Sequence, residues 1–445
     1  MTLRACSCLL IAMALLALAA SSCTSAETGE SGESARTGEE GVLMIEPGEA
    51  GAESTDELAS ADAAFALSLY RRLGTREGNV FFSPHSIYTA LAMTYVGARG
   101  ETERQMAEAL ELPALGEDVA RYTPEYRARL AGAFGALSRD LQSETSSDTH
   151  VFAEANALWY QTGYGFLDRF ISLNREGFGA RIEALDFARQ TEAARGVINE
   201  WVEEETLGKI EELIRPGDLD ELVRIVLTNA VYFRGLWAEE FDPEATREAP
   251  FHVVPGEPTE DVGVPMMSRK GDYAYAHVES PGLQILELPY AGEKASMLVV
   301  LPDEDLPGGV STVEKSLTPQ ALEGWISRMG EREVTVSIPR FEITWGTEDI
   351  IPDLEAMGIT DLFDEKCDLS GIDGTYELYV SKVLHKAFVE VNEEGTEAAA
   401  ATAVVGRLKA SMPLMFRADR PFLFLIRDTE TGAILFMGRV TDPTG

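Results

Sequence analysis

The sequence predicts a mixed α+β domain behind an N-terminal leader. Helical patterns occupy the first part of the folded region, and short β-rich runs bounded by Gly, Pro or Asp dominate the second part. Of the 445 residues, 45% are hydrophobic, which is enough for a large core. The sequence contains no internal repeat and no second domain boundary after residue 56, so one domain is expected from 56 to 445.

Helices are predicted from apolar residues that recur at helical spacing. Leu58, Ala61, Phe65 and Leu69 form one such repeat near the start of the folded region. A second helix is expected to start at Pro84, because proline is tolerated in the first turn of a helix. Further helices are predicted over 101–110, from there to about 141, and over 191–205.

Strands are predicted from β-rich runs between turn signals. The run over 222–233 is apolar enough for a buried strand. The complete set of predicted strands spans residues 151–159, 222–233, 284–288, 296–301, 334–338, 377–391, 421–426 and 433–440.

Residues 1–22 are predicted to be a signal peptide. Arg4 precedes an apolar run over 9–20 that is too short for a spanning helix but suits a signal-peptide core. The run ends in Ala20, Ser21, Ser22 and Cys23, which resembles a bacterial lipobox and implies lipidation of Cys23. An ordinary signal peptide cleaved nearby is the alternative. We expect export across the cytoplasmic membrane, with a lipid anchor in the cell envelope or an extracellular location.

Residues 23–55 read as an acidic flexible tether, because they are rich in Glu, Gly and Ser and hold too few apolar side chains to fold. Such a tether suits a lipid anchor, since it holds the domain clear of the membrane. If Cys23 carries lipid, Cys367 is the one cysteine left in the mature chain, so the domain is expected to lack disulfides. Cys367 is interpreted as a structural thiol.

The charge of the chain argues against two classes of partner. Asp and Glu number 75 against 37 Lys and Arg, for a formal net charge of -38. Such a surface repels phosphate backbones and anionic lipid, so neither nucleic-acid binding nor direct membrane docking is expected. Membrane contact is expected only through the N-terminal lipid. Basic partners, including many proteases, would be attracted, although solubility alone also explains the charge.

Motifs of catalysis are missing from the sequence. The five histidines show no metal-ligand spacing, and there is neither a Gly-x-Ser-x-Gly elbow nor a phosphate-binding glycine loop. We therefore predict no catalytic residue, no metal and no cofactor.

Residues 393–411 form the most unusual segment. A connector of this length between two strands is uncommon in a compact domain and is usually functional or disordered. The side chains at alternate positions Thr396, Ala398, Ala400 and Thr402 are all small, so the segment could slide between existing strands as a new strand. From composition alone, an Ala-rich helix or a plain surface loop is the alternative. The segment ends in two basic residues, at 407 and 409, which suit a trypsin-like cleft.

The motif NEEGTEAAAA at 392–401 resembles the hinge of the reactive-centre loop of an inhibitory serpin. Other blocks resemble the same family in the same order along the chain. They are NVFFSPHSI at 79–87, LTNAVYFRGLW at 227–237, VLHKA at 383–387, DRPFLF at 419–424 and LFMGRV at 435–440. Together these motifs cover roughly residues 56–443, and the chain is identified as a member of the serpin family, of a bacterial lipoprotein type.

The resemblance implies a serpin fold with three β-sheets, about eight or nine helices and an exposed reactive-centre loop. It implies a suicide substrate and not an enzyme, since the nucleophile belongs to the attacking serine protease. The cut loop would insert into the central sheet as an extra strand and trap the acyl-enzyme. The expected partner is a trypsin-like serine protease, and the chain is expected to be a monomer.

The resemblance also assigns site residues. The hinge is expected at Glu393, Gly395, Thr396, Ala398, Ala400 and Thr402; the shutter beneath the sheet at Ser83, Ser86, Asn229 and His385; and the breach, where the loop first inserts, at Trp237. His385 as no more than a core histidine, and Trp237 as a core aromatic, are the alternatives.

The scissile bond is expected at Lys409-Ala410. Ala410-Ser411 and Arg407-Leu408 are the alternatives, and cleavage after Ala410 would imply an elastase-like target. Two other functions stay open, namely a non-inhibitory serpin and an envelope solute-binding lipoprotein.

Overall fold

A computed structural model describes residues 52–445 except 117–118, 146–149, 255–260 and 396–413. The predicted α+β class is confirmed. Helix α1 spans Ala52–Leu73, so the last residues assigned to the tether are helical. The predicted lipidation site, the second half of the hinge and all three candidate scissile bonds lie outside the described residues.

The five-stranded sheet contains the two strands between which the predicted insertion would occur. β4 and β11 are direct neighbours in it and run parallel, in register from Lys382↔Val226 to Phe388↔Tyr232. In spatial order the sheet consists of β10 (Phe341–Asp349), β11 (Lys382–Val391), β4 (Ile225–Gly235), β2 (His150–Gln161) and β3 (Arg181–Leu185).

A nine-stranded sheet makes up most of the second half of the chain. Its strands form one continuous hydrogen-bonded path, so the described residues contain two sheets where the resemblance implied three. In order they are β1 (Val80–Phe82), β14 (Ile434–Val440), β13 (Phe422–Asp428), β8 (Ala295–Pro302), β7 (Leu283–Pro289), β6 (Asp261–Val278), β9 (Gly330–Pro339) and β12 (Leu414–Arg417), with β5 (Arg247–His252) also paired to β6.

Ten α-helices occur in the part of the chain that the structure describes, slightly more than the resemblance implied. The predicted start of α2 is confirmed, because Ser83 caps it by accepting the Ser86 N–H and Pro84 occupies the first turn. The other helices are α3 (Gly100–Ala109), α4 (Pro124–Thr145), α5 (Asp168–Ser172), α6 (Phe187–Glu205), α7 (Val310–Ser316), α8 (Pro319–Ile326), α9 (Ile351–Ala356) and α10 (Ser370–Asp373).

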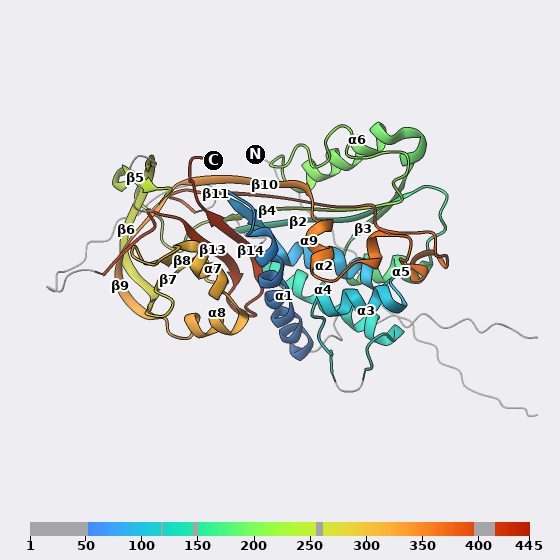
Figure 1. Cartoon of the computed structure of the whole chain (residues 1–445), viewed down its shortest axis with the longest axis horizontal. Coiled ribbons are helices and arrows are strands. Elements are labelled where there is room, and N and C mark those ends of the chain that lie inside the picture. The colour runs from blue at the N-terminus through green and yellow to red at the C-terminus, as the bar shows by residue number, and fades with distance from the viewer. Residues whose placement is uncertain (1–51, 117–118, 146–149, 255–260, 396–413) are drawn as a thin grey trace, which may run out of the picture. The chain divides into compact units, whose positions relative to one another are not determined.

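The two faces of the five-stranded sheet are covered by different helices. In Figure 1, α6 lies on one side of this sheet, and α1 to α4 lie on the other. Trp201 of α6 packs against Trp159 of β2 in an edge contact, with 5.3 Å between ring centroids. Helix α2 contacts β4 and β2 and also β14 of the larger sheet, so it lies between the two sheets.

Every predicted strand is observed, most of them with small shifts at their ends, but six observed strands were not predicted. The predicted strand over 377–391 begins only at Lys382. The 18-residue strand β6 and the strands β1, β3, β5, β10 and β12 were not predicted. In these segments, pairing with distant strands and not local sequence decides the conformation.

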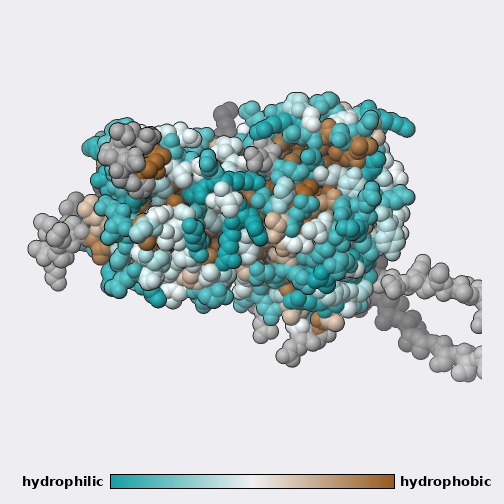
Figure 2. Space-filling view, viewed as in Figure 1, coloured by the Kyte–Doolittle hydropathy of each residue, from teal (hydrophilic) through white to brown (hydrophobic). Residues whose placement is uncertain are grey.

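The face shown in Figure 2 is largely hydrophilic, as the net charge leads one to expect. No helix in the described ranges combines the length and apolar character needed to cross a bilayer. Cys367 is a buried free thiol, and burial raises its pKa to about 12, which fits the structural role predicted for it.

Candidate functional site

The seam between β4 and β11 ends before either strand does. The ladder between them runs as far as Phe388↔Tyr232. Beyond that pair, β11 continues beside β10 as far as the pair Phe341↔Val391. β4 continues beside β2 as far as His150↔Gly235. Each strand thus keeps its outer partner to its end, whereas the described register between the two strands stops earlier.

A tight hinge turn, residues 392–395, follows β11 at this end of the seam. The Asn392 N–H donates to the Gly395 carbonyl at 2.9 Å, and the Gly395 N–H donates back to the Asn392 carbonyl at 3.3 Å. Gly395 has a φ of 139° and lies against the backbone of β4. A Cβ at this position would come within 2.1 Å of the Gly235 carbonyl oxygen, so the position requires glycine.

Trp237 fastens the hinge turn to the end of β4. Its backbone N–H donates to the Glu394 carbonyl at 3.0 Å, and its indole Nε1–H donates to the Asn392 carbonyl at 3.0 Å. The indole stacks on the Tyr290 ring with 4.7 Å between centroids and is nearly parallel to it. The predicted breach residue therefore touches the predicted hinge, and its role as a core aromatic holds as well.

Glu393 anchors the same turn through its side chain. Its carboxylate is buried and accepts hydrogen bonds from Arg340 at 2.5 Å and from the Thr246 hydroxyl. The Phe241 N–H donates to the Glu393 carbonyl at 2.8 Å. Burial alone would raise the pKa of Glu393, but the hydrogen bonds from Arg340 and Thr246 hold it below its ordinary value.

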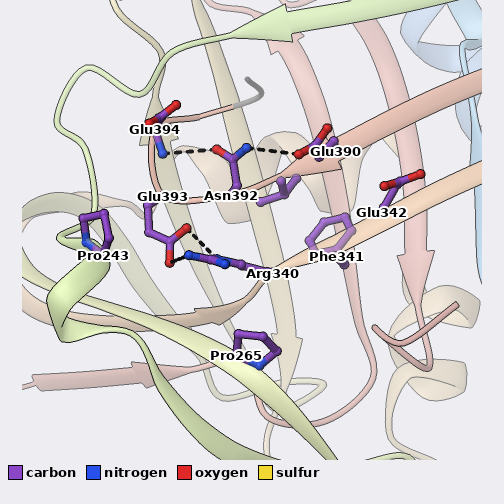
Figure 3. Close-up of a pocket in the computed structure, with 10 residues that line it drawn as sticks. Pro243, Pro265, Arg340, Phe341, Glu342, Glu390, Asn392, Glu393 and Glu394 are labelled. Atoms are coloured by element: carbon purple, nitrogen blue, oxygen red, sulfur yellow. Dashed lines mark hydrogen bonds and ion pairs between the residues drawn. The ribbon is translucent and has the colours of Figure 1, made fainter. Parts of the chain in front are cut away.

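A cavity of about 440 Å³ opens beside this ion pair. Figure 3 shows Arg340 and Glu393 pointing toward each other at its wall, with Glu390 and Glu342 farther along it. Asn392 donates to Glu390 at 3.2 Å and accepts the Glu394 N–H at 3.1 Å, which fixes the upper part of the turn. The cavity is therefore lined by the hinge itself and by the strands on which it rests.

The inner face of the seam holds a polar network. It consists of the predicted shutter residues Ser83, Ser86, Asn229 and His385, which are buried, and the half-buried Asn156. His385 of β11 and Asn229 of β4 are a register pair, and their side chains are hydrogen-bonded across the seam. Asn229 donates to both Ser86 and Asn156, and the Ser83 hydroxyl donates to the Leu435 carbonyl at 2.7 Å. The network thus links α2, β2, β4, β11 and β14.

His385 is neutral in this network. Its Nε2 accepts the Ser83 N–H at 3.1 Å, which assigns the ring proton to Nδ1 and makes Nδ1 the donor to Asn229. Burial lowers the pKa of His385 to about 3. A second proton on the ring would face the Ser83 N–H, so protonation is incompatible with the closed arrangement.

The structure brings together the predicted shutter residues Ser83, Ser86, Asn229 and His385, and separately the predicted hinge and breach residues Glu393, Gly395 and Trp237. The hinge residues Thr396, Ala398, Ala400 and Thr402, the scissile-bond candidates Arg407, Leu408, Lys409, Ala410 and Ser411, and Cys23 lie outside the described residues.

Sequence reasoning missed Asn156, Arg340 and Thr246. Asn156 is an amide between two buried alanines of a strand, and this isolated polar position was a usable signal. Arg340 and Thr246 lie 53 and 147 residues from their partner Glu393, and no local pattern marks them. Among the described residues, no group of three or more His, Cys, Asp or Glu side chains is placed to hold a metal ion.

Comparison with known proteins agrees with this geometry. The family model "Serpin (serine protease inhibitor)" matches residues 60–443. The leukocyte elastase inhibitor of Homo sapiens is 39% identical over 396 residues, which cover 87% of this chain and all of that protein. An uncharacterized serpin-like protein of Thermococcus kodakarensis is 40% identical over 392 residues, covering 87% of this chain and 86% of that protein.

Comparison with solved structures confirms the predicted serpin fold. Uncleaved ovalbumin superposes with a TM-score of 0.75 at 31% identity, covering 87% of this chain and all of that chain. The mouse protein-Z dependent protease inhibitor gives a TM-score of 0.76 at 29% identity, covering 87% of this chain and 98% of that chain. The family model and these relatives span the whole folded region, and the chain therefore belongs to the serpin family.

Proposed function

We propose that the chain is a suicide-substrate inhibitor of serine proteases, with a trypsin-like target. One observation carries the proposal: the parallel neighbours β4 and β11 stop pairing at Phe388↔Tyr232, and the hinge turn sits directly beside this open end of the seam. The hinge turn therefore lies where a segment continuing from it could enter between the two strands. Its alternating small side chains suit such a passage.

The proposed reaction begins as ordinary proteolysis. The protease serine attacks the carbonyl carbon of Lys409, the bond to Ala410 breaks, and the amine of Ala410 leaves with a proton. Residue 409 is then held as an ester on the protease. The freed end is no longer tied to β12, so residues 396–409 can add to the sheet as a strand between β4 and β11.

Insertion has a clear thermodynamic drive. Insertion breaks the single ladder between β4 and β11 and replaces it with two, because the added strand pairs with β4 on one side and with β11 on the other. It also carries the esterified protease away from the hinge. The chain itself supplies no catalytic group in this scheme, which accords with the inhibitor names of its relatives.

The proposal is tested by incubating the purified domain with trypsin and with a pancreatic elastase, followed by denaturing gels. A band at the summed mass that survives boiling in detergent is the expected result with trypsin. Sequencing the released C-terminal peptide locates the scissile bond, and Ala410 at its N-terminus supports Lys409. Lys409→Ala should abolish the trypsin complex, while the matched control Arg407→Ala should keep it. A complex with elastase alone would assign cleavage after Ala410 instead.

A non-inhibitory serpin is the second candidate. Thyroxine-binding globulin in complex with thyroxine is among the similar solved structures, so the fold alone does not separate protease inhibition from ligand binding. The melting temperature before and after loop cleavage does. A large rise in melting temperature without a covalent complex would support insertion of the cut loop and would mean that the target is a protease other than those tested. No rise favours a non-inhibitory protein, and ligand-dependent stabilisation without any response to cleavage favours solute binding.

We further propose that Cys23 carries a lipid and that the acidic tether holds the inhibitor away from the membrane. The support is the small-residue sequence before Cys23 and the unusual composition of the segment after it. Mass spectrometry of the mature N-terminus should find a diacylglyceryl cysteine. Cys23→Ala should shift the protein from the membrane fraction to the soluble fraction. A mature chain that starts elsewhere and carries no lipid would contradict the anchor but not the inhibitory function.

A further inference from the structure

Lys209 lies over the outer face of the seam, on the side that α6 covers. Its ammonium nitrogen is 5.7 Å from the ring centroid of Tyr232 in β4 and 5.5 Å from that of Phe388 in β11. The two rings are 6.4 Å apart, and both residues are buried. A cation within about 6 Å of an aromatic ring is attracted by the quadrupole of the ring. One side chain thus bridges the two strands that the proposed function requires to separate.

The two rings mark a particular place on the seam. Phe388 and Tyr232 are the last register pair before β4 and β11 stop pairing. A strand that enters from the hinge side must separate this pair before any other. Lys209 therefore contacts the seam at the pair where opening begins.

The backbone of Lys209 is held in place. Its N–H donates to the carbonyl of Thr206 at 3.0 Å, in the turn that ends α6. The chain that follows is fixed by Asn199 of α6, whose side-chain oxygen accepts the N–H groups of Leu213 at 3.1 Å and Ile214 at 2.9 Å. Hydrogen bonds therefore hold the backbone on both sides of Lys209, which fixes the point from which its side chain reaches the rings.

Other contacts of this region act differently. Lys386 of β11 donates to the carbonyl of Glu212 at 2.8 Å, but this bond ties one strand to its cover and not the two strands to each other. On the inner face, the hydrogen bond between His385 and Asn229 does cross the seam. Lys209 links β4 and β11 on the outer face, as the hydrogen bond between His385 and Asn229 links them on the inner face.

We infer that Lys209 is a positioning residue that sets the rate at which β4 and β11 part. The inference rests on the proposed function, in which this parting is the step that follows cleavage. Neighbouring strands lie about 4.8 Å apart, and an added strand doubles that separation. The added strand would then stand between the two rings, so Lys209 could not remain over both. Its contacts stabilise the closed sheet and slow its opening.

The test follows strand addition without any protease. A synthetic peptide with the sequence of residues 396–409 is mixed with the intact protein, and its uptake is followed over time on native gels. Lys209→Met keeps the length of the side chain but removes the charge, and we expect roughly tenfold faster uptake. Lys209→Arg retains a cation that binds aromatic faces and should stay within about twofold of the unchanged protein.

The matched control is Lys270→Met. Lys270 is an exposed lysine of β6 paired with Glu333, so its loss changes the net charge equally but leaves the seam intact. A second test is a double-mutant cycle with Phe388→Leu and Tyr232→Leu. If Lys209 acts through the rings, Lys209→Met should have little further effect in the background that lacks both rings.

Uptake by Lys209→Met at the unchanged rate, or an equal acceleration in the background without the rings, would overturn the inference. So would a protein that takes up no peptide at all. The proposed function is judged separately by the covalent complex with trypsin. A protein that forms no complex but shows the expected order of uptake rates would contradict inhibition and still support the role of Lys209.

Discussion

Arg340 contacts both carboxylate oxygens of Glu393, each at 2.5 Å. This pairing joins the segment after β9 to the hinge turn across 53 residues of sequence. The Glu393 side chain is almost fully buried, whereas that of Arg340 is 45% exposed. The ion pair therefore holds the hinge turn at residues 392–395 against the body of the domain.

Glu393→Gln should weaken this pairing. The substitution keeps the shape of the side chain but removes the charge that Arg340 and Thr246 satisfy. We expect the free energy of unfolding to fall by about 1–2 kcal/mol, since one partner is half exposed and screened. Urea unfolding followed by circular dichroism measures the change. Glu394→Gln, at the adjacent position, is the matched control and should be close to neutral. Equal effects of the two variants would contradict a specific role of the ion pair.

Gly395→Ala should destabilise the hinge turn for a steric reason. The added Cβ would approach the Gly235 carbonyl oxygen to 2.1 Å and the Leu236 Cα to 2.5 Å, at a φ of 139°. A loss of more than about 1 kcal/mol in the free energy of unfolding is expected. Gly196→Ala within α6 is the control, because its Cβ would meet no heavy atom within 4 Å and alanine favours a helix. The two variants should therefore change stability in opposite directions, and a neutral Gly395→Ala would refute the close approach.

The sequence predicted the fold class well because the helices and most strands carry their own local patterns. β6 escaped prediction because Gly263, Pro265 and Gly271 read as turn signals, and its burial pattern does not alternate cleanly. Pairing with β5, β7 and β9 overrides those signals. β10 bends at a bulge near Gly346, whose φ is 111°, so its pattern is interrupted as well.

Only those site residues that lie in recognised sequence motifs were predicted. Ser83, Asn229 and His385 lie in sequence blocks that resemble the family, and the structure joins them in one network. Arg340 is an arginine after a strand, and only the fold brings it to Glu393. The position of Lys209 over two rings could not be predicted either, because the rings come from strands that are distant in sequence. Pairwise partners of this kind are set by tertiary packing.

Thr396→Arg should turn the inhibitor into a substrate. Insertion would bury the new charge on the inward face of the added strand, which slows insertion and lets the acyl-enzyme hydrolyse first. The expected result with trypsin is cleaved protein without the detergent-stable complex. Glu397→Arg, one position along and of opposite parity, is the matched control and should still form the complex. Unchanged inhibition by Thr396→Arg would refute the hinge assignment.

His385 should make the stability of the protein sensitive to acid. Its pKa is about 3 in the folded state, where burial disfavours the charged ring, against an ordinary value of 6.5 when the chain is unfolded. The unfolded chain therefore binds a proton first, so the contribution of His385 is complete above pH 6.5 and is lost as the pH falls from 6.5 toward 3. Each pH unit in that window should cost about 1.4 kcal/mol.

His385→Gln tests this expectation, because glutamine keeps one donor and one acceptor for Asn229 and Ser83 but does not titrate. The free energy of unfolding is measured against pH for both proteins. The variant should start lower at neutral pH, since its amide fits the network less well, and should then lose less stability than the unchanged protein as the pH falls below 6.5. Parallel curves would mean that His385 does not control the acid response, and the closed shutter would then tolerate a charged ring.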